Sequence, residues 1–178
     1  SVEGMPILLQ RPGLLAVQKP PRISSDSLIE KVREYLRNAG QASQVTRVSR
    51  LDVLTSGVLI IALGSRYSAA AACVVAQFAG RLVTKMYHCL CSGRALGAGG
   101  GVGLIRSSLD KDGDNENLRA FVSAGGLDAQ TILRVMGCYI LSSSQSSASG
   151  SEVFTLLAVR PLTGRTHQIR AHLASLGR

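Results

Sequence analysis

A lone acid lies in a basic and apolar stretch of the first half of the chain. Asp52 follows Arg47 and Arg50, and it precedes a Thr-Ser-Gly triplet at residues 55–57 and an apolar run at residues 58–63. An opposite charge within a few ångströms lowers the pKa of an acid, so these arginines can hold the carboxylate ionised. The apolar run indicates a buried strand, which gives the acid a rigid mount. The pattern predicts either a reactive carboxylate or a turn-forming Asp before a strand.

Tyr87 is a second candidate for chemistry. It lies in an expected strand at residues 82–92, two residues after Lys85 and shortly before Gly93. A phenol can transfer a proton, and its ring can stack on a base that has left its helix. A tyrosine on a strand is more commonly a core residue, so both interpretations stay open on the sequence pattern alone.

The segment at residues 160–177 reads RPLTGRTHQIRAHLASLG and is rich in cationic side chains. Arg165 follows a turn at the expected N-terminus of a helix, where a guanidinium and free N–H groups together favour phosphate. Arg170 follows on that helix, and it either pairs with a carboxylate or binds phosphate. His167 and His172 are expected to be structural hydrogen-bonding residues rather than metal ligands, because five-residue spacing does not align them on one helix face.

Three motifs in this order resemble those of one enzyme family. They are SRLDVLTSG at residues 49–57, Lys-x-Tyr at residues 85–87 and TGRTHQIRAHL at residues 163–173. Together they resemble the RNA pseudouridine synthases that carry an HRLD motif, in the branch that modifies uridines of large-subunit ribosomal RNA and transfer RNA. The resemblance extends over residues 14–177, with two apparent loop insertions.

The chain departs from this family at two places. LLAVQKP at residues 14–20 resembles the family's early strand and Lys-Pro turn, but Pro21 and Arg22 stand where the family has a small residue and Gly. Ser49 stands where the family has His. These departures favour an alternative, which is a catalytically weak or inactive relative that binds RNA during RNA folding or ribosome assembly.

The resemblance implies a reaction and a set of catalytic residues. The family isomerises uridine to pseudouridine after the base has flipped out of its stack. Asp52, Tyr87 and Arg170 occupy the family's catalytic positions, and Arg170 is implied to pair with the Asp52 carboxylate. This carboxylate either attacks as a nucleophile or removes a sugar proton to give a glycal, and both routes stay open. No cofactor and no metal ion is implied.

Four further cations are expected to contact RNA, namely Arg50, Arg165, Lys19 and Lys85. Arg50 lies beside the candidate carboxylate. Flipping a base out of its stack costs a few kcal/mol, and an inserted side chain can offset part of that cost. We therefore expect Arg50 to contact the RNA close to the target uridine.

Composition and length limit the class of protein. The chain has 178 residues, a formal net charge of +9 and 46% hydrophobic residues. The excess of cations indicates a polyanionic partner such as RNA. The length predicts one catalytic domain over residues 1–178, which we expect to act as a monomer. Because the family continues past the position of Gly177, we expect this domain to be truncated at its C-terminus.

The four cysteines, Cys73, Cys89, Cys91 and Cys138, lack the spacing of a metal site or of a disulfide framework. This favours a reducing intracellular compartment. No apolar run reaches the ~20 residues that span a bilayer, and no secretory signal is visible. We therefore expect the protein away from membranes, in the cytoplasm or in an organelle after removal of a transit peptide.

The elements that position the candidate residues follow from periodicity. A stripe of apolar residues predicts a helix over residues 24–40, with Ser27 and Glu30 at capping-box spacing. An Ala-rich segment predicts a second helix over residues 65–80, beginning at Ser65. Strands are expected over residues 14–17, 58–63, 82–92 and 152–160, and the resemblance implies a further strand over residues 126–136. The alternation favours an α+β fold with a mixed, mainly antiparallel sheet flanked by helices, to which the resemblance adds a central RNA-binding cleft.

Two stretches, near residues 94–117 and 142–151, are expected to be flexible insertions. The first contains a Gly-rich run and an acidic run, which raise a nucleotide-dependent or metal-dependent enzyme as a third alternative. The glycine spacing fails the dinucleotide fingerprint, and the acidic run lacks the distant Glu of a calcium loop. Neither run is therefore favoured as a binding site.

Overall fold

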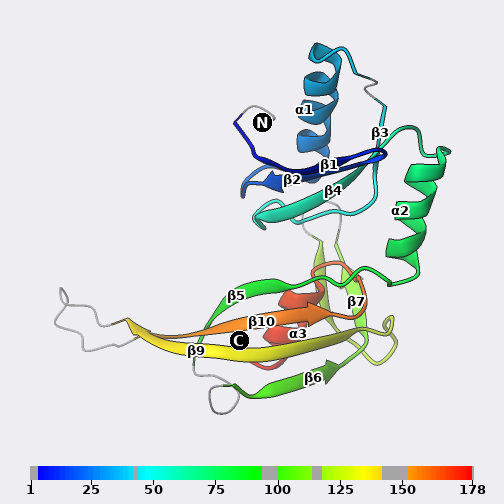
Figure 1. Cartoon of the computed structure of the whole chain (residues 1–178). Coiled ribbons are helices and arrows are strands. Elements are labelled where there is room, and N and C mark those ends of the chain that lie inside the picture. The colour runs from blue at the N-terminus through cyan, green and yellow to red at the C-terminus, as the bar shows by residue number, and fades with distance from the viewer. Residues whose placement is uncertain (1–3, 42–43, 94–99, 114–117, 142–151, 178) are drawn as a thin grey trace. The chain divides into compact units, whose positions relative to one another are not determined.

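The computed structural model describes residues 4–41, 44–93, 100–113, 118–141 and 152–177 (Figure 1). The chain forms two compact units, Ser1–Val83 and Thr84–Arg178. Each unit contains a four-stranded sheet, and the described strand pairings are antiparallel. Helices together with antiparallel sheets confirm the predicted α+β class. The single catalytic domain over residues 1–178 stays a prediction.

The sheet of the first unit has the order β1-β2-β4-β3. Its strands are β1 (Ile7–Arg11), β2 (Leu14–Lys19), β3 (Val45–Arg47) and β4 (Gly57–Leu63). Successive side chains of a strand point to opposite faces of the sheet. Leu15 and Val17 of β2, and Leu59 and Ile61 of β4, follow this alternation, and all four are fully buried. They form the apolar face on which the first helix packs.

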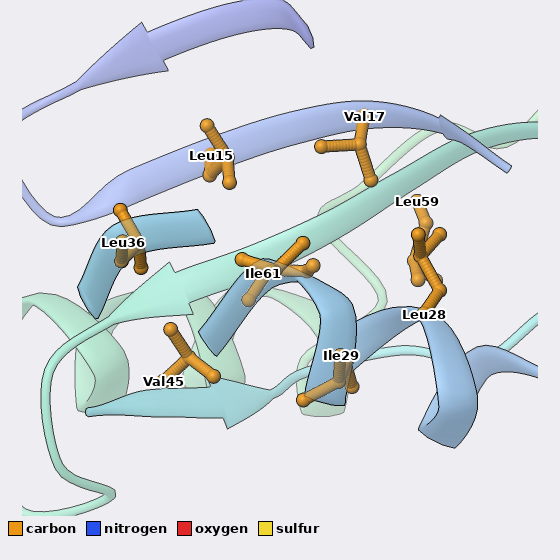
Figure 2. Packing of buried hydrophobic residues seen from close by; sticks show 9 residues of the cluster. Leu15, Val17, Leu28, Ile29, Leu36, Val45, Leu59 and Ile61 are labelled. Atoms are coloured by element: carbon orange, nitrogen blue, oxygen red, sulfur yellow. The ribbon is translucent and has the colours of Figure 1, made fainter. Parts of the chain in front are cut away.

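Helix α1 (Ser25–Asn38) covers this face. Leu28, Val32 and Leu36 recur every fourth residue, so they form one buried stripe. Figure 2 shows Leu28 and Leu36 of this stripe directed toward the side chains of β2 and β4. Burying one side chain of this size contributes about 1.5–3 kcal/mol, so the interface between α1 and the sheet stabilises this unit.

The ends of α1 are set by local side chains. The Ser24 hydroxyl accepts a hydrogen bond from the Ser27 amide at 3.0 Å, so Ser24 is the N-cap. The capping box predicted at Ser27 and Glu30 is therefore wrong, because the helix has already begun before Ser27. The predicted stop is confirmed, since Gly40 directly after the helix has a φ of +67°.

Helix α2 (Ala69–Ala79) is shorter than the sequence predicts. The Ser68 hydroxyl caps it, and the predicted start at Ser65 is wrong because Ser65 instead accepts the Ser68 amide in a preceding turn at 2.9 Å. The β1–β2 turn approaches this helix closely. A Cβ atom placed at Gly13 would lie 2.3 Å from the Cβ atom of Ala70. Only a glycine fits this contact.

The sheet of the second unit has the order β5-β10-β9-β6, and β7 pairs with β8 in a separate hairpin. Its elements are β5 (Tyr87–Ser92), β6 (Val102–Arg106), β7 (Leu109–Asp112), β8 (Arg119–Val122), β9 (Gln130–Leu141), β10 (Glu152–Pro161) and α3 (Gln168–Ser175). A second core cluster joins β5, β9, β10 and α3 through Cys91, Leu133, Val135, Leu157, Val159 and Leu173. Within the described residues, no helix is long and apolar enough to cross a membrane.

The expected insertion near residues 94–117 contains regular structure. Strand β6 lies in the Gly-rich run, and β7 includes the first residues of the acidic run. The prediction of flexible loops is therefore wrong for these strands. The reason is long-range, because β6 forms five residue pairs with β9 that local composition does not reveal. The rest of the two expected insertions lies outside the described residues, at residues 94–99, 114–117 and 142–151. There, flexibility stays a prediction.

Candidate active site

Asp52 lies in the loop between β3 and β4, five residues before the first residue of β4. Its carbonyl accepts a hydrogen bond from the Thr55 amide at 3.0 Å, which closes a turn. Its side chain is half-buried. The acid is thus mounted on a turn that leads directly into a buried strand, in agreement with the sequence pattern.

Ser25 holds the backbone just before Asp52. Its hydroxyl donates to the Leu51 carbonyl at 2.9 Å and accepts from the Leu51 amide at 3.0 Å. Ser25 is the first residue of α1, and its relative exposure is 4%. The start of α1 therefore satisfies both backbone polar groups of the residue next to the acid.

The backbone just after Asp52 is also held. The Val53 carbonyl accepts from the Arg22 amide at 2.7 Å and from the Lys19 ammonium group at 3.2 Å. A carbonyl oxygen has two lone pairs and can accept both bonds. Asp52 therefore sits between two anchored neighbours, which restricts the backbone that carries its carboxylate.

Lys19 is buried and does not reach the surface. Its relative exposure is 0%, and its ammonium group also donates to the Pro20 carbonyl at 2.9 Å and the Ile23 carbonyl at 2.7 Å. Together with the Val53 carbonyl, these acceptors match the three donors of an ammonium group. The prediction that Lys19 contacts RNA is therefore corrected, because its burial and its carbonyl partners give it a structural role.

A cation that the sequence pattern does not place near Asp52, namely Lys19, interacts with this acid. Burial lowers the pKa of Lys19, and the negative charge of Asp52 opposes this lowering. Lys19 is thus a cation in the electrostatic field of the acid. Arg47 forms an ion pair with a different carboxylate, that of Asp26 on α1. Arg50 has an exposed side chain and forms no salt bridge with the part of the chain that the structure describes.

Tyr87 is the first residue of β5 in the second unit, where it pairs with Val159 of β10. Its side chain is half-buried and packs against the second core cluster, as does Ile169 of α3. Ile169 directly precedes Arg170, whose side chain is exposed. Both interpretations of Tyr87, as a core residue and as a catalytic residue, are compatible with this placement.

A buried glutamine holds the start of α3. Gln168 has a relative exposure of 4%. Its side-chain oxygen accepts from the Thr163 hydroxyl at 2.7 Å and from the Arg165 amide at 3.0 Å. Its side-chain nitrogen donates to the Gln130 carbonyl and to the Thr131 hydroxyl, each at 2.9 Å. Two of these bonds attach the first turn of α3 to β9, and the other two attach it to the segment that leads into the helix.

His172 has the structural role that the sequence predicts. It is fully buried, with Nδ1 2.8 Å from the Thr131 hydroxyl and Nε2 2.9 Å from the Ser107 carbonyl. A carbonyl only accepts, so Nε2 carries a proton. The Thr131 hydroxyl also accepts from the Gln168 side chain, so His172 and Gln168 share one buried partner on β9.

Lys85 and Arg165 are half-buried in the second unit and make contacts with protein backbone. Lys85 donates to the Thr163 carbonyl at 3.4 Å, and Arg165 donates through Nε to the Asp128 carbonyl at 3.0 Å. Arg165 lies three residues before the first residue of α3, so it stands in the segment that leads into the helix and not in its first turn. The RNA contacts of both residues stay predictions.

The candidate catalytic residues are divided between the units. Asp52 belongs to the first unit, and Tyr87 and Arg170 belong to the second. The predicted ion pair between Arg170 and Asp52 therefore stays a prediction. No group of three or more His, Cys, Asp or Glu residues in the described ranges could hold a metal ion. The arrangement supplies an anchored carboxylate that can act as a nucleophile or as a base.

Three positioning residues were not identified from the sequence, namely Ser25, Gln168 and, in this role, Lys19. Ser25 resembles an ordinary residue of a helix start, and nothing in its neighbourhood signals a contact with Leu51. Gln168 does carry a sequence signal, because it stands inside the motif at residues 163–173. Its burial in the structure then requires that its side chain be hydrogen-bonded. Lys19 precedes two prolines, and a lysine there gives no sign of burial.

Comparison with known proteins finds similarity over almost the whole chain. A family model described as RNA pseudouridylate synthase matches residues 7–175. The dual-specificity RNA pseudouridine synthase RluA of Vibrio vulnificus is 28% identical over 180 residues, which cover 96% of this chain and 64% of that protein. The tRNA pseudouridine synthase C of the same organism is 32% identical over 127 residues, which cover 71% of this chain and 49% of that protein.

A solved structure with a similar fold comes from the same family. The human RNA pseudouridylate synthase domain containing 1 has a TM-score of 0.76 and 27% identity, and the match covers 99% of this chain and 67% of that chain. The chain spans 64% or less of the length of the two Vibrio relatives. The similarity therefore concerns a part of each of those longer proteins.

Proposed function

The chain belongs to the RNA pseudouridylate synthase family, and on this premise we propose that it isomerises specific uridines of RNA to pseudouridine. The observation that carries the proposal is the anchored Asp52 loop, which lies within the matched residues 7–175. We propose ribosomal or transfer RNA as the substrate. The similarity to a protein named for tRNA supports the second of these.

The proposed reaction rearranges one glycosidic bond. The bond from ribose C1′ to uracil N1 breaks, and a bond from C1′ to uracil C5 forms. The hydrogen at C5 leaves as a proton and N1 gains a proton, so the product is an isomer of the substrate. Asp52 supplies the carboxylate, either as the nucleophile or as the base that removes a sugar proton.

Two residues of the second unit complete the proposed site. The ring of Tyr87 is proposed to stack on the flipped uracil, and its hydroxyl to take part in the proton transfer at C5. Arg170 is proposed to pair with the Asp52 carboxylate, because a guanidinium fixes the orientation of a carboxylate through two parallel hydrogen bonds. Lys19, buried beside the same loop, contributes a positive charge to its surroundings.

The release of tritium tests this proposal. Ribosomal and transfer RNA from cells that lack the protein, labelled with tritium at C5 of uridine, should lose label to water when the protein is added. Asp52→Asn should abolish the release and leave RNA affinity nearly unchanged. Asp26→Asn, the same change at the exposed acid of α1 that pairs with Arg47, is the matched control and should keep the release. No release by the wild-type protein, alongside release by a control synthase, refutes the proposal.

Ser49 favours a second candidate function, because it stands in the loop of Asp52 where related enzymes have His. The alternative is a protein that binds RNA in RNA folding or ribosome assembly without turnover. Tight RNA binding together with no tritium release from any RNA fraction supports this alternative. Release that disappears on Asp52→Asn excludes it.

We also propose that the protein acts as a monomer in a reducing compartment, either the cytoplasm or an organelle. The four cysteines are free thiols, which supports the second part of this proposal. Sedimentation of the purified protein tests the monomer, and fractionation of cells that express a tagged protein tests the compartment.

A further inference from the structure

We propose that Arg22 binds a phosphate of the substrate RNA beside the Asp52 loop, an inference that rests on the proposed function. The Arg22 amide donates to the Val53 carbonyl at 2.7 Å, and Val53 directly follows Asp52. This bond fixes the start of the Arg22 side chain next to the loop that carries the acid. The side chain itself is exposed.

The fold explains the backbone conformation of Arg22 but not the presence of its charged side chain. Its φ is +67°, in the left-handed region that residues other than glycine occupy at a cost. The bond to Val53 explains this backbone, but a glycine would make the same bond without that cost. The guanidinium forms no hydrogen bond or ion pair with the described residues, so the fold does not explain it. The strain by itself identifies no ligand, since Arg81 shows it too, and the feature particular to Arg22 is its bond to the residue that follows Asp52. An unpaired cation held beside the candidate catalytic acid points to a ligand that reaches that acid.

The chemistry of the ligand follows from the position of Asp52. A uridine whose ribose reaches the Asp52 carboxylate carries a phosphate on each side. Arg50 is exposed two residues before the acid, and Arg22 is anchored to the residue after it. One arginine therefore precedes the acid in the chain, and the backbone of the other is bonded to the residue that follows the acid. A guanidinium binds phosphate through two parallel hydrogen bonds, so these arginines suit the two phosphates that flank the target nucleotide.

The salt dependence of RNA binding tests this inference. The affinity of the protein for a fluorescein-labelled single-stranded oligouridylate is measured by anisotropy over a series of salt concentrations. Each lost phosphate contact reduces the slope of log K against log salt by about 0.7 for single strands. Arg22→Gly should show this reduction and bind about tenfold more weakly at low salt, since hydrogen bonds between charged groups are strong. Arg22→Lys keeps the charge and should keep the slope.

Arg81 provides a matched control. It is another exposed arginine of the first unit with a positive φ, +59°, and it lies away from the Asp52 loop in sequence. Arg81→Gly relieves the same backbone strain and removes the same charge, and it should leave the slope unchanged. A thermal melt of both glycine variants should show that neither is less stable than the wild-type protein.

Two outcomes overturn the inference. One is an Arg22→Gly slope equal to that of the wild-type protein, and the other is no binding of the oligouridylate by the wild-type protein. Tritium release tells a failure of the proposed function apart from a failure of this inference. If the proposed function fails, no RNA releases tritium. If the salt slopes of Arg22→Gly and Arg81→Gly nevertheless differ, Arg22 is retained as a phosphate-binding residue.

Discussion

The hydroxyl of Ser25 bonds both backbone polar groups of Leu51. It donates to the carbonyl at 2.9 Å and accepts from the amide at 3.0 Å. Because Leu51 precedes Asp52, the first residue of α1 acts as a cross-link between that helix and the loop of the candidate catalytic acid. The hydrogen bonds of Lys19 and Arg22 to Val53 supply the same restraint on the other side of Asp52.

Ser25→Ala should lower both stability and turnover. The substitution leaves the amide and the carbonyl of Leu51 without their partner, and each buried polar group left unpaired costs about 1–3 kcal/mol. Urea denaturation should show a loss of this size. Tritium release should fall more than RNA affinity, because the acid is held less firmly. Ser27→Ala, on the exposed side of the same helical turn, is the control and should change turnover little. Equal effects of the two variants on turnover contradict this prediction.

The sequence predicts the elements of the first unit well where local pattern decides them. The stripe at Leu28, Val32 and Leu36 predicts α1, and the apolar run before Leu63 predicts β4. The motif around Asp52 identifies the candidate acid by resemblance. Helix starts are less well predicted, because the choice of Ser24 as the cap depends on the extended backbone that leads into it.

The contacts around the acid could not be predicted, because they join residues far apart in sequence. Lys19 reaches a carbonyl 34 residues away, and Ser25 contacts a residue 26 positions away. A lysine is normally exposed, so only the carbonyls gathered around it explain its burial. Arg47 likewise has a carboxylate nearby in sequence but pairs with one on α1.

Lys19→Met should make stability depend less on pH. Burial lowers the pKa of Lys19 from its ordinary value of 10.5. Between that lowered pKa and 10.5 the unfolded chain binds more protons than the folded chain, so the free energy of unfolding rises with pH in this window. Lys19→Met abolishes this rise, and it also costs about 1–3 kcal/mol for each carbonyl left unpaired.

The measurement is the difference in unfolding free energy between the wild-type protein and Lys19→Met, from neutral pH upwards. This difference should grow as the pH approaches 10.5. Lys111→Met, at an exposed lysine of β7, is the control and should show no such growth. A difference that shrinks with pH contradicts the prediction and indicates that Asp52 outweighs the effect of burial.

Gly13→Ala should destabilise the first unit. The backbone of Gly13 has a φ of +76°, and an added Cβ atom would lie 2.3 Å from the Cβ atom of Ala70. The conformational cost and the overpacking together predict a loss of about 2–5 kcal/mol. Gly4→Ala separates the two effects, since Gly4 has a φ of +81° but, among the described residues other than its chain neighbours, no heavy atom within 4 Å of the added Cβ. Urea denaturation should rank Gly13→Ala as the more damaging change, and the opposite order is incompatible with the close contact.

Cys89 should resist alkylation in the folded protein. Burial, together with the charge and hydrogen bond of Cys91, raises the pKa of Cys89 to about 12 from an ordinary 9.0. Since only the thiolate reacts, its reactive fraction at a given pH is about 1,000-fold below that of an ordinary thiol. Peptide mapping after iodoacetamide should find the exposed Cys73 labelled and Cys89 unlabelled. In urea both should react, and equal labelling without urea argues against the raised pKa.

Gln168→Met should disturb the start of α3 and, through it, the position of Arg170. The substitution keeps the size of the side chain but removes all four hydrogen bonds, which takes the acceptor away from the Arg165 amide and from the buried Thr163 hydroxyl. We expect a loss of about 2–4 kcal/mol in urea denaturation, as for other broken buried networks. Gln130→Met is the matched control, because among the described residues the Gln130 side chain has only a 3.5 Å contact with Asp128.

The effect on function separates a positioning role from a purely structural one. If Gln168 positions Arg170 for the Asp52 carboxylate, Gln168→Met should lower kcat well below that of Gln130→Met at a temperature where both variants are folded. RNA affinity should stay within a few-fold of the wild-type value, because the exposed cations are unchanged. Loss of stability with an unchanged kcat restricts Gln168 to holding α3 on β9. In that case the proposed coupling from the glutamine to the arginine is absent.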